Sequence, residues 1–154
     1  MKVYELTGDI LSSRIREPGI LIRTGPFVCH LRSSIQSVID GVRLFYADHT
    51  LVSGEAFADF HIELVAPGGL RRWLHRQVVF LFDGRAPFLP LPYDQAFPML
   101  EWGLNWCVAN HAHQYLILHA AVVEKGGCAA ILPGAPGAGK STLCAGLVTR
   151  GWRL

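Results

Sequence analysis

Gly134-Ala135-Pro136-Gly137-Ala138-Gly139-Lys140-Ser141 is the stretch that decides the fold of the C-terminal part of the chain. It fits the pattern G-x-x-x-x-G-K-[ST] at every fixed position. A short apolar run at 128–132 precedes it, and an apolar segment with Leu143 and Leu147 follows it. We therefore expect a buried strand, a glycine-rich loop and a helix at about 139–150 in succession, which is the setting that this pattern requires.

Each residue type in this loop has a physical reason to hold a polyphosphate. Glycines let the backbone fold closely around phosphate oxygens, and the N-terminus of the next helix adds its positive end. We expect Lys140 to reach the β- and γ-phosphates and the Ser141 hydroxyl to bind Mg²⁺. The alternative is a glycine-rich turn that only caps a helix and leaves Lys140 in solvent. The predicted nucleotide site, a P-loop or Walker A motif, consists of Gly134, Ala135, Pro136, Gly137, Ala138, Gly139, Lys140, Ser141 and Thr142.

His119 is a second candidate residue, on the strand that leads to the loop. The β-rich runs 115–123 and 128–132 flank Gly126-Gly127, which is typical of a tight hairpin. A two-residue turn there places His119 opposite Gly134. Its imidazole could then bond a phosphoryl oxygen, since histidine titrates near neutral pH. A packed histidine bonded to the backbone fits the same spacing.

The first half of the chain predicts an α+β region with antiparallel strands. Residues 19–31 contain a Gly-Pro turn between β-branched runs, which indicates a hairpin. The apolar spacing after Ser34 predicts a short helix capped by Ser33 or Ser34. Residues 57–65 and 70–82 flank a Pro-Gly-Gly turn and predict a second antiparallel pair.

A proline-rich loop at 83–98 is expected to lead into a longer helix that Asp94 caps. This helix should end between Asn110 and His113. Trp102 and Trp106 are four residues apart on it, a spacing that suits a core or a subunit contact. Its expected apolar face consists of Phe97, Leu100, Leu104, Cys107 and Val108. The whole is an α/β chain with an N-terminal α+β region at 1–112 and the start of a P-loop domain at 113–154.

Composition excludes several classes of protein. Of 154 residues, 51% are hydrophobic and 17% are charged, which excludes disorder and leaves apolar surface for a homo-oligomer contact. A formal charge of +2 is too small for a nucleic-acid footprint. The longest stretch without Asp, Glu, Lys or Arg, 102–123, carries asparagines and histidines that are costly in hydrocarbon, so we expect no membrane span. With no secretory signal at the N-terminus, the expected location is cytoplasmic.

The cysteines fit a reducing compartment. Cys29, Cys107, Cys128 and Cys144 contain no CxxC pair, and we expect them to be core residues. Cys107, His111 and His113 could hold zinc at a helix end, but the sequence shows no fourth ligand.

The C-terminal segment resembles the HPr serine kinase/phosphorylase-like family of P-loop kinases. The resemblance covers about the last forty residues. It is carried by Leu118-His119-Ala120-Ala121-Val122-Val123, Gly126-Gly127, the loop at 134–142 and Arg150-Gly151-Trp152-Arg153-Leu154. It implies that His119 and Lys140 belong to an active site and that Ser141 binds magnesium. With Glu101-Trp102-Gly103-Leu104-Asn105-Trp106 included, the chain is most similar to the subgroup called HPr-kinase-related kinase A.

The expected activity is transfer of the γ-phosphoryl group of ATP to a hydroxyl, a serine of a protein acceptor or a small molecule, with Mg²⁺ as cofactor. The family places an acidic pair after the Arg-Gly-x-x-Leu segment, and this chain ends at Leu154. We therefore expect an N-terminal piece of a longer kinase that alone binds nucleotide weakly and turns over poorly. A P-loop ATPase or GTPase, and a non-catalytic module that senses nucleotide, are the alternatives.

Overall fold

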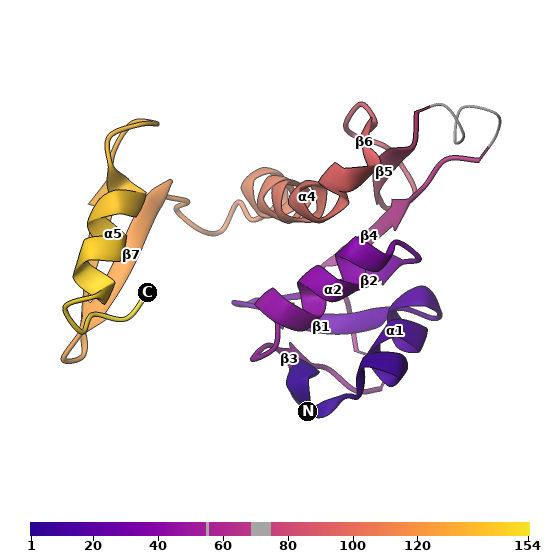
Figure 1. The fold of residues 1–154 in the computed structure, drawn as a ribbon, viewed down its shortest axis with the longest axis horizontal. Helices are drawn as coiled ribbons and strands as arrows, with labels where there is room; N and C mark the ends of the chain where they lie inside the picture. Colours follow the sequence, from indigo (N-terminus) through magenta and orange to yellow (C-terminus); the bar gives the residue numbers. More distant parts are fainter. Residues whose placement is uncertain (55, 69–74) are drawn as a thin grey trace. The chain divides into compact units, whose positions relative to one another are not determined.

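A computed structural model describes residues 1–54, 56–68 and 75–154 of the chain. The chain divides into two compact units, Met1–His111 (unit 1) and Ala112–Leu154 (unit 2), and unit 2 is drawn in orange to yellow in Figure 1. The beginning of the predicted strand at 70–82, residues 70–74, lies outside the described residues.

Unit 1 is a mixed α/β layer structure. Its described elements are, in chain order, η1 (Val3–Glu5), α1 (Gly8–Arg16), β1 (Ile20–Thr24), β2 (Phe27–Ser33), α2 (Gln36–Phe45), β3 (Thr50–Leu51), β4 (Phe60–Val65), β5 (Gln77–Phe82), β6 (Leu91–Pro92), η2 (Tyr93–Gln95) and α4 (Ala96–His111). The strands form one sheet in the order β3-β1-β2-β4-β5-β6. The predicted hairpin of β1 with β2 and the predicted antiparallel pair of β4 with β5 are confirmed.

The pairing of β2 with β4 is parallel, whereas the sequence predicted only antiparallel strands. The chain passes through α2 and β3 between these two strands, so it returns to the starting end of β2 before β4 begins. Such a crossover is the connection that parallel neighbours need. The sheet is therefore mixed.

One face of the sheet forms the core of unit 1. Alternate residues of β4, and of β2 from Cys29 onward, are buried, and the residues between them are exposed or half-buried. Helix α1 contacts β2, α4 contacts β5, and α2 contacts both of these helices. The buried side chains of the two central strands are Phe27, Val28, Cys29, Leu31, Ser33, Phe60, Ile62 and Leu64.

The helices differ from the prediction in three places. Helix α1 carries no strong periodic signal and was not predicted. The Ser33 hydroxyl accepts a hydrogen bond from the Ile35 amide and donates one to the Leu64 carbonyl, so it ties the start of α2 to β4 and does not cap the helix. Asp94 lies in η2, one short turn before α4 begins.

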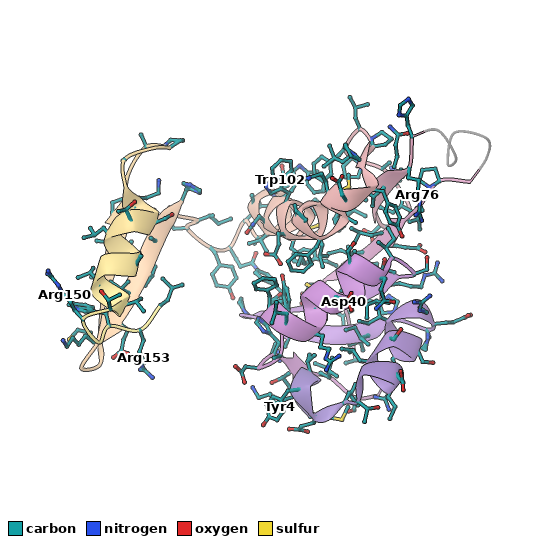
Figure 2. All side chains as sticks on the ribbon, viewed as in Figure 1. Tyr4, Asp40, Arg76, Trp102, Arg150 and Arg153 are labelled. Atoms are coloured by element: carbon teal, nitrogen blue, oxygen red, sulfur yellow. The ribbon has the colours of Figure 1, made fainter. Side chains whose placement is uncertain are left out.

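The buried face of α4 also departs from the predicted one. The helix buries Ala96, Met99, Leu100, Gly103 and Cys107, while Phe97, Leu104 and Val108 are only half-buried. Gly103 belongs to this face because a Cβ there would overlap the ring of Phe80. Trp106 packs against Phe82 and Phe88, whereas Trp102, labelled in Figure 2, is 66% exposed.

Unit 2 is a hairpin with one helix against it. Strands β7 (Ala120–Lys125) and β8 (Cys128–Pro133) pair around Gly126-Gly127, and α5 (Lys140–Val148) packs on β7. The first strand is shorter than predicted, since it begins at residue 120 and not at 115. At the predicted new strand, Arg153 makes a single antiparallel bridge to Glu124.

Cys128 is exposed, so the expectation that all four cysteines are core residues is wrong at this position. It lies at the first residue of β8, directly after the turn, where no element covers it. Cys29, Cys107 and Cys144 are buried as predicted. Among the helices in the described ranges, none has the length and apolarity that crossing a bilayer requires.

Candidate functional site

Residues 134–139 join the end of β8 to the start of α5, the strand–loop–helix order that the pattern predicts. The expectation that this strand is buried is wrong, because the residues of β8 are exposed or half-buried. Gly137 and Gly139 both have φ of 81°, in the left-handed region that favours glycine. The Ala138 amide donates to the Ala135 carbonyl at 3.1 Å and closes the turn between them. The positive φ angles at positions 137 and 139 thus explain why both residues are glycines.

Lys140 is the first residue of α5, and its side chain folds back over the beginning of the loop. Its ammonium group donates to the carbonyl oxygens of Gly134 at 2.6 Å and Ala135 at 3.0 Å. A Cβ on Gly134 would lie 3.3 Å from the Ala138 Cβ and 3.6 Å from the Lys140 Cγ. The first glycine of the motif therefore leaves room for the lysine stem and for the far side of the loop.

Backbone amides at the end of the loop and in the first turn of α5 are free to bind a ligand. The Leu143 amide donates to the Gly139 carbonyl and starts the helical ladder. In the described part of the chain, no acceptor pairs with the amides of Gly137, Gly139, Lys140, Ser141 and Thr142. Unpaired amides at a helix N-terminus carry partial positive charge and favour an anion.

Ser141 and Thr142 are exposed in this first turn. The Ser141 hydroxyl makes no hydrogen bond to any described residue, so its oxygen is available. Magnesium binds oxygen ligands and keeps several waters, with one or two protein ligands and substrate phosphates. A single hydroxyl beside a phosphate-binding loop fits that mode of binding.

His119 lies just beyond the strand ladder. The last pair of the ladder is Ala120 with Pro133, so His119 and Gly134 are the next residues on the two strands. The observed register follows the two-residue turn at Gly126-Gly127, whose φ angles are 63° and 82°. The His119 ring is exposed and forms no hydrogen bond within the described ranges.

The zinc alternative at the end of α4 finds no support in the geometry. Cys107 is buried, and burial raises the pKa of its thiol to about 12. The His111 ring packs edge-on against Phe82 with centroids 4.7 Å apart. The described residues contain no group of three or more side chains that could hold a metal ion.

Comparisons with protein-family models, with curated proteins and with solved structures found no match for this chain.

Proposed function

We propose that residues 134–142 bind the triphosphate of a nucleotide with Mg²⁺ and that the protein transfers the γ-phosphoryl group of ATP to a hydroxyl acceptor. The observation that carries the proposal is the placement of Lys140 at a helix N-terminus, folded over a loop with two left-handed glycines and several free amides. These features together give a cation and several unpaired donors in one loop, which is what a polyphosphate needs.

Lys140 is already held close to the loop that would hold the phosphates. Its two carbonyl partners are neutral, whereas phosphate oxygens are charged, and hydrogen bonds between charged groups are roughly twice as strong as neutral ones. A bound phosphate would therefore compete well for at least one of the two bonds. The ammonium would then stabilise the charge on the transferring group while the loop keeps its shape.

Ser141 would hold Mg²⁺ through its hydroxyl oxygen. The bound ion neutralises charge between the β- and γ-phosphates, which lowers the cost of breaking the bond between them. His119, at the end of β7, has an unpaired imidazole that could donate to a phosphoryl oxygen. These assignments give the loop its binding role and leave the acceptor hydroxyl to be identified.

A serine-peptide array tests the kinase function directly. The complete gene product is incubated with Mg²⁺ and γ-labelled ATP, and label on peptides, free phosphate and ADP are all measured. The proposal predicts label on serine peptides and its loss in the Lys140→Ala variant. Release of free phosphate in step with ADP would instead identify an ATPase, and binding without either product would identify a nucleotide-sensing module. Both of these outcomes contradict the kinase proposal.

A further inference from the structure

His30 and His61 lie side by side on the sheet face opposite the one that buries Cys29, Leu31, Phe60 and Ile62. They occupy paired positions on the parallel strands β2 and β4. The two Nδ1 atoms are 3.4 Å apart, and the ring centroids are 5.4 Å apart at an interplanar angle of 66°. His61 is exposed and His30 is half-buried, unlike the buried residues Cys29 and Ile62 that neighbour them on these strands.

We propose that His30 and His61 bind a borderline divalent transition metal ion such as Zn²⁺ through their Nδ1 atoms. A tetrahedral ion that takes two imidazole nitrogens at about 2.0–2.1 Å holds those nitrogens about 3.3–3.4 Å apart. The observed Nδ1–Nδ1 distance is therefore already that of two ligands of one ion. Imidazole nitrogen is a ligand that suits zinc, copper and nickel.

The orientation of His30 is fixed by a second interaction. Its Nε2 lies 3.1 Å from the carbonyl oxygen of Pro18. Because a carbonyl oxygen can only accept, Nε2 carries the proton, and the Nδ1 of neutral His30 presents a lone pair to His61. A backbone carbonyl on the other ring nitrogen is the usual support of a metal-binding histidine.

Gly19 makes room for this arrangement. Its φ is 106°, and a Cβ there would overlap the His30 ring at Nε2. Any other residue at position 19 would push the imidazole from its place beside Pro18. The backbone at Pro18 and Gly19, just before β1, thus fixes the position of the His30 ring.

The next pair of residues on this face carries charges that compensate each other. Two positions along each strand, Arg32 forms an ion pair with Glu63 at 2.8 Å. Both histidines line an open cavity of about 600 Å³, which Arg14, Leu21 and Ser53 also line. Water from this cavity would complete the coordination of the ion. For binding, the proton of neutral His61 must lie on Nε2, so that its Nδ1 presents a lone pair to the ion.

Zinc titration of the full chain tests the site. Histidine ring ¹⁵N spectra and calorimetry are recorded with Zn²⁺ alone for the wild type and for His30→Gln, His61→Gln and His113→Gln. His113 is an exposed histidine of unit 2 and serves as the matched control.

The proposal predicts one equivalent of Zn²⁺ and joint shifts of the His30 and His61 Nδ1 signals. Loss of the group that hydrogen-bonds to a metal ligand typically weakens metal binding at least about tenfold, so loss of either ligand itself should cost no less. The His113→Gln variant should bind as the wild type does. Unshifted Nδ1 signals in the wild type, or unchanged affinity in both ligand variants, would overturn it. The wild-type spectra decide the matter even if a variant fails to fold. The result is independent of nucleotide binding by the loop.

Discussion

The ammonium group of Lys140 donates a 2.6 Å hydrogen bond to the carbonyl of Gly134, the first residue of the same loop. The lysine thus closes the loop on itself, and the bond spans six residues of chain. Because the donor sits at the start of α5 and the acceptor just after β8, this bond joins the strand to the helix. If the loop binds a phosphate as proposed, the cation is already in position.

The left-handed conformation of Gly139 predicts a large effect of a small substitution. Gly139→Ala forces an L-residue to φ of 81°, which costs about 1–2 kcal/mol. We expect amide hydrogen exchange of β7 and β8 to become about 5–30-fold faster. Gly146→Ala is the control, since its Cβ would meet open space in the interior of α5 and should slow exchange. Equal effects of the two substitutions would contradict the assigned backbone geometry.

The contact between Gly103 and Phe80 predicts strain in the core of unit 1. Gly103→Ala places a Cβ in the Phe80 ring and should lower the free energy of unfolding by about 1–3 kcal/mol or more. Asn105→Ala, on the exposed side of α4, should change it by less than about 0.5 kcal/mol. Chemical denaturation measures both. Adding Phe80→Leu to Gly103→Ala should recover part of the loss, and strict additivity would show that the two residues do not meet.

The pKa of Glu124 should depend on Arg153. Hydrogen bonds from the Arg153 side chain and the Gly127 amide hold this pKa below its ordinary value of 4.5. Because folding lowers the pKa, the interaction stabilises the hairpin above that ordinary value and is lost as the pH falls through the folded-state pKa. Carboxyl ¹³C NMR should show the pKa rising in Arg153→Gln and unchanged in Arg150→Gln, whose side chains are both labelled in Figure 2. An unchanged pKa of Glu124 in the Arg153→Gln variant would contradict the pairing of these two side chains.

Thiol labelling should distinguish Cys128 from the other three cysteines. Cys128 is exposed, whereas Cys29 and Cys107 are buried and burial raises the pKa of each thiol. We expect one fast equivalent of a thiol reagent per folded chain and four after unfolding. Mass spectrometry of the labelled peptides should place the fast equivalent at Cys128. Rapid labelling of Cys107 would contradict the packing of α4.

Local signals were enough to predict the loop and both hairpins that contain tight turns. A two-residue turn fixes the register of its hairpin, which is why the position of His119 next to the loop could be derived from Gly126-Gly127. The positive φ of Gly137 and Gly139 likewise follows from the glycine pattern. The hydrogen bonds of Lys140 to two loop carbonyls could not be predicted, because no sequence pattern indicates them.

Features made by distant segments could not be predicted. The parallel pairing of β2 with β4 depends on a crossover, and it brings together His30 and His61, which are 31 residues apart. From the sequence alone, Gly103 is a residue of low helix propensity. The structure shows that a Cβ at this position would overlap the Phe80 ring. Helix α1 buries only Leu11 and Ile15, too sparse a stripe for its periodicity to be recognised.

Calorimetric titration with Mg-ATP tests the central claim most directly. Lys140→Ala removes a charged donor to the phosphates, worth about 1.5–3 kcal/mol, so affinity should fall about 10–100-fold or more. Lys125→Ala removes an exposed lysine at the other end of the hairpin and should bind as the wild type does. Omission of Mg²⁺, and Ser141→Ala in its presence, should each weaken binding. Wild-type affinity in the Lys140→Ala variant, or no binding of Mg-ATP by the unaltered chain, would contradict the account.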